Sequence, residues 1–149
     1  MKASVNWRAS SDGLMFDAVM DSGQSMTFDG SGAPSAASDG QTTQREAALS
    51  PMQAVLMSVG ACSSVDVVEI MRKARQGIEA CVCQLEAKRA DDAPKVFTQI
   101  HAHYLVTGTN IKEKQLARAV QLSCEKYCSV MLMINSKVDI TTSYEIKEN

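Results

Sequence analysis

The hydrophobic and polar positions begin as short alternating runs. Three such runs lie at residues 4–8, 14–20 and 24–28, and Asp-Gly or Ser-Gly pairs stand between them. These pairs favour tight turns between antiparallel strands, because Gly and Asp tolerate the backbone conformations of such turns. The pattern therefore predicts an amino-terminal β-meander. Residues 31–43 are rich in Ser, Gly, Ala and Asp without any periodicity, and we expect a loop there.

The longest apolar run covers residues 52–71 and follows a clear helix start. The tetrad Ser-Pro-Met-Gln at 50–53 supplies a Ser cap, a Pro at the first helical position and a Gln that closes a capping box. We expect this helix to run to about Gln76 and to stop at Gly77. It is apolar nearly all round, so it is predicted to lie at the centre of a fold or of a dimer.

The second half of the chain alternates between strand and helix patterns. Residues 78–90 and 95–108 are rich in Val, Ile, Thr and Tyr and are joined by Asp-Asp-Ala-Pro, which predicts a hairpin. Residues 111–135 return to helical periodicity and predict a second helix or a broken pair of helices. Residues 138–146 predict a final, edge-like strand. This order indicates an α+β fold rather than a doubly wound one, in a single domain over 1–149.

Composition and charge narrow the range of partners. A formal net charge of −2 and a pI near 5.7 give no basic surface for nucleic acid or for anionic membranes. The amino terminus does not have the pattern of a secretory signal, so a cytoplasmic location is expected. The apolar run at 52–71 is interrupted by serines and by Asp66, and a central Asp costs about 2.5 to 3.5 kcal/mol in a bilayer. A buried helix is therefore favoured over a membrane span.

Two of the five cysteines lie in the two most apolar helical segments. Cys62 is in the first of these helices and Cys128 is in the second. An odd number of cysteines in a cytoplasmic chain argues against a disulfide scaffold and leaves catalytic, redox, metal or packing roles open. A single thiol in such surroundings is usually an inert small hydrophobe. Both cysteines together favour a redox interpretation, because the two helices would meet in one core.

The spacing of these features resembles the OsmC/Ohr family, and within it the YhfA-type branch. The resemblance rests on the Ser-Pro helix start, on Cys62 eleven residues after Pro51, and on Cys128 in the segment Lys-Tyr-Cys-Ser-Val. It implies reduction of organic hydroperoxides without a bound cofactor, with Cys62 as the peroxidatic thiol and Cys128 as the resolving thiol. It also implies a dithiol reductant and an intertwined homodimer. Cys124, one helical turn before Cys128, could compete as resolving thiol, but packing is its expected role.

The residues that activate the thiol in this family are not matched here. The resemblance implies an Arg hydrogen-bonded to a Glu, but Met52 occupies the Glu position and Thr27 the Arg position. Arg8 and Arg45 are the candidates to replace that Arg. A thiolate needs such a cation or hydrogen bonds to lower its pKa. The alternative function is therefore a non-enzymatic protein of this fold that binds a small hydrophobic ligand or acts as a slow redox sensor.

A second group of candidate residues lies on the predicted hairpin. A turn centred on Asp92 would put Cys83 opposite His101 and Cys81 opposite His103, with all four side chains on one face. A Cys2His2 metal site would then be possible. The Cys-x-Cys spacing is unusual for zinc, however, and favours core positions, so no metal is expected. The two histidines are expected to be exposed or hydrogen-bonded rather than general bases.

Overall fold

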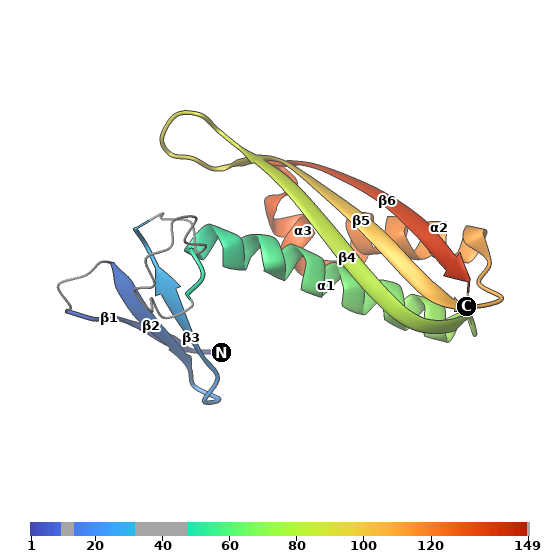
Figure 1. Ribbon diagram of the computed structural model, residues 1–149, viewed down its shortest axis with the longest axis horizontal. Helices are drawn as coiled ribbons and strands as arrows, with labels where there is room; N and C mark the ends of the chain where they lie inside the picture. Colours follow the sequence, from blue (N-terminus) through green and yellow to red (C-terminus); the bar gives the residue numbers. More distant parts are fainter. Residues whose placement is uncertain (10–13, 32–47, 149) are drawn as a thin grey trace, which may run out of the picture. The chain divides into compact units, whose positions relative to one another are not determined.

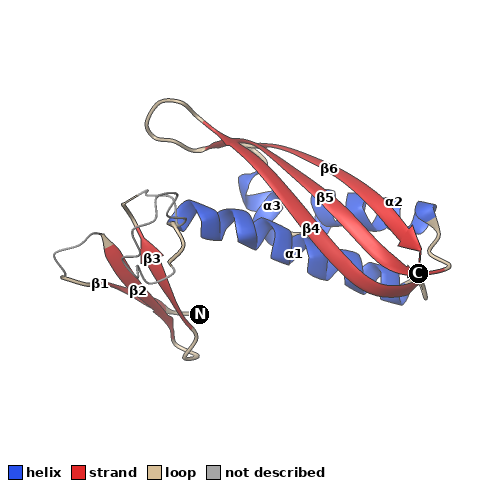
Figure 2. Cartoon of the chain, in the orientation of Figure 1, coloured by secondary structure: helices blue, strands red, loops and turns tan. Residues whose placement is uncertain are grey.

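The computed structural model describes residues 1–9, 14–31 and 48–148. They divide into two compact units, Met1–Val55 and Leu56–Asn149, each of which is described by itself. The mixed architecture of strands and helices confirms the predicted α+β class (Figures 1 and 2). The elements in chain order are β1 (Ala3–Trp7), β2 (Met15–Met20), β3 (Ser25–Asp29), α1 (Pro51–Lys73), β4 (Gly77–Arg89), β5 (Phe97–Thr109), α2 (Glu113–Leu122), the π-helical turn η1 (Ser123–Tyr127), α3 (Ser129–Ile134) and β6 (Asp139–Glu148).

The first unit contains a three-stranded antiparallel sheet in the order β1-β2-β3, which confirms the predicted meander. Trp7 pairs with Phe16 and Phe16 with Phe28, so one face of the sheet carries a row of aromatic side chains. Val5 belongs to the next row of the same face and is 63% exposed, and Trp7 is 58% exposed. One face of this sheet is therefore apolar and carries exposed side chains. The predicted loop at 31–43 lies outside the described residues, apart from Ser31.

Helix α1 begins as the sequence predicts and ends earlier than expected. The Ser50 amide donates to Gln53 Oε1 at 2.8 Å, and the Gln53 amide donates to Ser50 Oγ at 3.3 Å, which is the expected capping box. At the other end the Gln76 amide donates to the Met71 carbonyl at 3.0 Å, and Arg75 adopts a positive φ of 55°. Arg75 thus has the left-handed backbone conformation that often ends a helix, whereas the sequence predicts this helix end at Gly77 instead. The prediction of a stop at Gly77 is wrong because the chain reverses two residues before it.

The second unit is a three-stranded sheet covered on one face by the helices (Figure 1). β4 and β5 form the predicted antiparallel hairpin, and β6 pairs in parallel with β5 at the edge of the sheet. Alternate residues of β5 are buried against the helices, among them Ile100, Tyr104 and Val106, which are at most 1% exposed. A Cβ on Gly60 of α1 would come within 2.7 Å of a Leu85 methyl carbon, so α1 packs closely on β4.

Over the part of the chain that the structure describes, one side of α1 is buried and the other is exposed. Val59, Val67 and Met71 are fully buried, whereas Met57 and Val65 are 55% and 63% exposed. By length and composition alone α1 is apolar enough to span a membrane, with a mean hydropathy of 1.6, and 28% of that stretch is buried. Its central polar residues nevertheless have hydrogen-bond partners in the second unit, described below. The helix is therefore a core element with one apolar side left uncovered.

The region 111–135 is a broken helix, one of the two forms that its pattern allows. α2 ends at Leu122, the chain widens into the π-helical turn η1, and Cys128 adopts an extended conformation before α3 begins. Short π-helical segments are uncommon and occur often at functional sites, because the extra residue redirects the side chains around it. Here the turn separates α2 from Cys128 and places that residue at the start of α3.

Candidate active site

Helix α1 and the start of α3 bring two thiols together. Cys62 lies in the middle of α1 and is half-buried, and Cys128 immediately precedes α3 and is fully buried. Burial raises the pKa of Cys128, and a hydrogen bond between the two thiols raises it further. The expected meeting of the two segments in one core is therefore observed. The catalytic roles of the two cysteines stay predictions.

The surroundings of Cys128 favour its neutral form. Burial is the main cause that raises its pKa from 9.0 to about 11, and the backbone amide of Met131 opposes this rise in part. That amide donates to Cys128 Sγ at 3.5 Å as the cap of α3. Cys128 is therefore a protonated thiol at neutral pH. It becomes a good nucleophile only when its proton is removed.

A buried serine joins the π-helical turn to α1 beside the thiols. Ser123 is fully buried, and its hydroxyl lies 3.1 Å from the Ser63 carbonyl and 3.0 Å from Asp66 Oδ2. The Ser63 hydroxyl in turn donates to the Val59 carbonyl at 2.8 Å. Sequence reasoning missed Ser123, although a serine inside an apolar helical segment is a detectable signal. These bonds fix the turn before Cys128 against the residue that follows Cys62.

Tyr104 of β5 is the second residue that sequence reasoning missed. Burial raises the pKa of its hydroxyl, and a hydrogen bond between this hydroxyl and Ser63 opposes the rise. The nearby thiols of Cys83, Cys128 and Cys124 raise this pKa further, which places the phenol among three thiols. Its only sequence signal is the burial pattern of β5, because the partners of its hydroxyl come from other elements. Tyr104 therefore connects the thiol pair to the sheet.

The other three cysteines have the character of packing residues. Burial raises the pKa of Cys81, Cys83 and Cys124, and in each case it is the largest cause. Ser64 of α1 hydrogen-bonds to both Cys81 and Cys83, and Tyr104 also bonds to Cys83. These contacts fill the space between α1 and β4. The expected packing role of Cys124 agrees with its half-buried position in η1.

The strand register that would allow a Cys2His2 site on the hairpin is wrong. Cys83 pairs with Tyr104 rather than with His101, and Cys81 pairs with Val106 rather than with His103. The shift is by three residues, an odd number, so the cysteines face the helices and the histidines face the opposite side. His101 and His103 were expected to be either exposed or hydrogen-bonded, and the structure shows that both are hydrogen-bonded. Over residues 1–9, 14–31 and 48–148 there is no group of three or more His, Cys, Asp or Glu side chains that could hold a metal ion.

The candidate cation for thiol activation is held within the first unit. Arg8 makes a bidentate ion pair with Asp17, with Nε and Nη2 each 2.6 Å from a carboxylate oxygen. The Thr27 hydroxyl donates to the same carboxylate at 3.1 Å. The hydrogen bonds from Arg8 hold the pKa of Asp17 below its usual value. Met52 is half-buried in the first turn of α1, and Arg45 lies outside the described residues.

Fold and site together define an α+β dithiol protein, with one thiol in a long helix and the other at the start of a later one. The model of the family described as OsmC-like protein matches residues 42–143, and the chain belongs to this family. It is 42% identical to Protein YhfA of Escherichia coli K12 over 98% of both chains.

Solved structures agree with this assignment. A hypothetical protein from Aquifex aeolicus VF5 is 31% identical and has a TM-score of 0.78, with 100% of this chain and 98% of that chain covered. The organic hydroperoxide resistance protein OhrB of Bacillus subtilis has a TM-score of 0.60 at 17% identity, with 97% of this chain and 98% of that chain covered. At that identity the likeness to OhrB shows the fold alone.

Proposed function

We propose that this protein is a thiol-dependent peroxidase that reduces organic hydroperoxides through Cys62 and Cys128. The observation that carries the proposal is the hydrogen-bonded pair of thiols between α1 and the start of α3. The roles are supported by exposure, because Cys62 is half-buried whereas Cys128 is fully buried and has a raised pKa. The hydroperoxide resistance named for OhrB of Bacillus subtilis supports the choice of substrate.

The proposed cycle balances without a bound cofactor. The Cys62 thiolate attacks the outer oxygen of the hydroperoxide, the O–O bond breaks, and the alkoxide leaves as an alcohol after taking up a proton. Cys62 is then a sulfenic acid. The Cys128 sulfur attacks the Cys62 sulfur, water leaves, and a disulfide forms. A dithiol reductant from solution restores both thiols by exchange and becomes a disulfide itself.

The test is a mass-spectrometric map of the thiols after one equivalent of cumene hydroperoxide, with hydrogen peroxide in parallel. We expect a Cys62–Cys128 disulfide to form rapidly and faster with cumene hydroperoxide. Cys62→Ser should abolish peroxide consumption, and Cys128→Ser should leave a sulfenic acid on Cys62 that a dimedone probe traps. Cys81→Ser is the matched control and should retain turnover. Full turnover in the Cys62→Ser protein would overturn the proposal.

A second candidate function is a slow redox sensor or a binding protein for a small hydrophobic ligand. It is favoured by Met52 at the Glu position of the resemblance and by the raised pKa of Cys128, about 11, which slows disulfide closure. In this case Cys62 and Cys128 would stay reduced for many minutes under the same conditions. The same thiol map therefore separates the two functions.

The protein is further proposed to work as a homodimer in the cytoplasm. Two apolar surfaces support the dimer: the face of the first sheet with Val5 and Trp7, and the uncovered side of α1 with Met57 and Val65. A second copy would cover such surfaces, since monomeric proteins rarely expose large apolar patches. A reducing compartment agrees with five free cysteines and with a dithiol reductant.

A further inference from the structure

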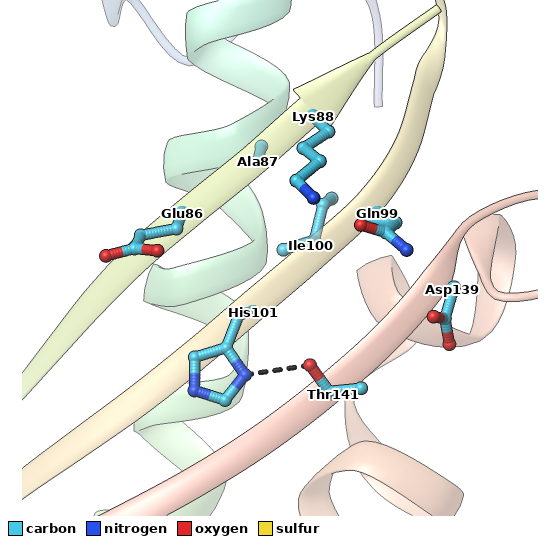
Figure 3. Close-up of a pocket in the computed structure, with 8 residues that line it drawn as sticks. All are labelled: Glu86, Ala87, Lys88, Gln99, Ile100, His101, Asp139 and Thr141. Atoms are coloured by element: carbon cyan, nitrogen blue, oxygen red, sulfur yellow. Dashed lines mark hydrogen bonds between the residues drawn. The ribbon is translucent and has the colours of Figure 1, made fainter.

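The outer face of the second sheet is polar, on the side opposite the thiols. A shallow pocket of about 370 Å³ lies there, with side chains from β4, β5 and β6 around it (Figure 3). Its charged groups are the carboxylates of Glu86 and Asp139 and the ammonium of Lys88. Glu86 is the cross-strand neighbour of His101. The local charge is therefore negative on balance around an imidazole.

Two imidazoles on this face converge on one oxygen atom. His101 and His103 are two residues apart on β5, so their side chains point to the same side of the sheet. His101 Nε2 lies 2.8 Å from Ser143 Oγ, and His103 Nδ1 lies 2.7 Å from the same oxygen. Both histidines are only half-buried, so solvent and ions reach them. Two ring nitrogens thus face a common point that is open to solution.

The second ring nitrogen of His101, Nδ1, also has a hydrogen-bond partner. His101 Nδ1 lies 2.7 Å from Thr141 Oγ1, a contact that Figure 3 draws as a dashed line. When Nδ1 carries the ring proton and donates it to Thr141, the lone pair of Nε2 points at the common point. A hydrogen bond of this kind on the outer nitrogen is typical of histidines that bind metals, because it fixes both the tautomer and the ring orientation.

We propose that His101 Nε2 and His103 Nδ1 form a chelating site for an exchangeable divalent transition-metal ion of the nickel, copper and zinc class. Imidazole nitrogens suit these metals, and the ion takes the place where the Ser143 hydroxyl now joins the two rings. The nearby carboxylates of Glu86 and Asp139 attract a cation to this face. Two protein nitrogens with water in the remaining positions give a site that loads and releases its ion readily, unlike a structural zinc site. The site is independent of the proposed peroxidase, whose thiols lie on the opposite face.

Nickel chloride added to the reduced, ¹⁵N-labelled full-length protein tests the site by nuclear magnetic resonance. We expect saturable paramagnetic broadening at one equivalent, centred on His101, His103 and Ser143. His101→Gln and His103→Gln should each weaken binding about 100-fold, because either change converts a chelate into a single contact. Thr141→Val keeps both nitrogens but frees the ring of His101, and we expect a loss of about 10-fold.

The control variants separate this site from the thiols. Cys81→Ser and Cys83→Ser should leave the nickel response unchanged, because these side chains face the helices. Ser143→Ala should also retain binding, since the hydroxyl is displaced rather than required. The inference is overturned if the broadening centres on residues beside the cysteines, or if the single histidine variants bind nickel as tightly as the unmodified protein.

Discussion

At the scale of single residues, the two paired cysteines differ in what surrounds them. Cys128 is fully buried, caps α3 by accepting a hydrogen bond from the Met131 amide, and is hydrogen-bonded to Cys62. Cys62 is half-buried on α1 and is therefore the more accessible of the two. This asymmetry agrees with the separate tasks proposed for the two thiols. It also means that the slow step of the proposed cycle is removal of the Cys128 proton.

The raised pKa of Cys128 predicts a loss of stability at alkaline pH. The thiol ionises near 9.0 in the unfolded chain and near 11 in the folded protein, so the unfolded state releases its proton first as the pH rises. The stabilisation is complete below pH 9, and about 2 to 3 kcal/mol is lost by pH 11. Urea unfolding of the reduced protein across this range measures it. Cys128→Ala should show a shallower decline, and an identical decline in both proteins would contradict the assignment.

Ser123 is predicted to position the resolving thiol. Ser123→Ala leaves the Asp66 carboxylate and the Ser63 carbonyl without this partner, which should lower the free energy of unfolding by about 1 to 3 kcal/mol. The variant should also close the disulfide more slowly after Cys62 is oxidised, while sulfenic acid forms on Cys62 at the normal rate. Stopped-flow oxidation with separate detection of the two steps distinguishes this from simple destabilisation. Ser129→Ala, at an exposed serine beside Cys128, is the matched control.

At the scale of elements, local signals were predictable and long-range pairings were not. The start of α1 follows from the tetrad at 50–53, because both residues of its capping box, Ser50 and Gln53, lie within those four positions. The register of β4 against β5 does not follow, because bulges at 78–80 and 88–89 and the length of the connecting turn shift it. The parallel pairing of β6 and the roles of Ser123 and Tyr104 depend on partners distant in sequence. The thiol pair was found because both cysteines stand in strongly apolar segments.

The close packing of α1 on β4 predicts a strong effect at Gly60. A side chain there meets Leu85 at 2.7 Å and Cys83 Sγ at 3.6 Å, so Gly60→Val should lower the free energy of unfolding by about 1 to 3 kcal/mol. Ala61→Val, at the neighbouring exposed position, should have little effect. Adding Leu85→Ala to Gly60→Val should restore part of the loss. Chemical denaturation of the four proteins gives the comparison, and equal stability of the Gly60 and Ala61 variants would refute close packing.

At the scale of the whole molecule, the exposed apolar surfaces allow the proposed dimer to be tested. Trp7 lies on the open face of the first sheet, and Asn6 lies on its opposite, polar face beside Asp17. Trp7→Lys should therefore convert the proposed dimer into a monomer, because a charge would be buried without a partner at the interface. Asn6→Lys should leave the dimer intact. Light scattering after size-exclusion chromatography measures the oligomeric state of both variants. A monomeric unmodified protein would contradict the proposed dimer.

The alternation of thiols and imidazoles across one sheet has a consequence for the tolerance of insertions and deletions. Tyr104 faces the thiols and its neighbour His103 faces solvent, so the two chemistries are separated by the thickness of one sheet. Removing a single residue inside β5 would turn the histidines inward and the phenol outward over the rest of the strand. Removing one between residues 90 and 96 changes only the connection. We therefore expect related chains to vary in length at that turn and to keep the length of β5 constant.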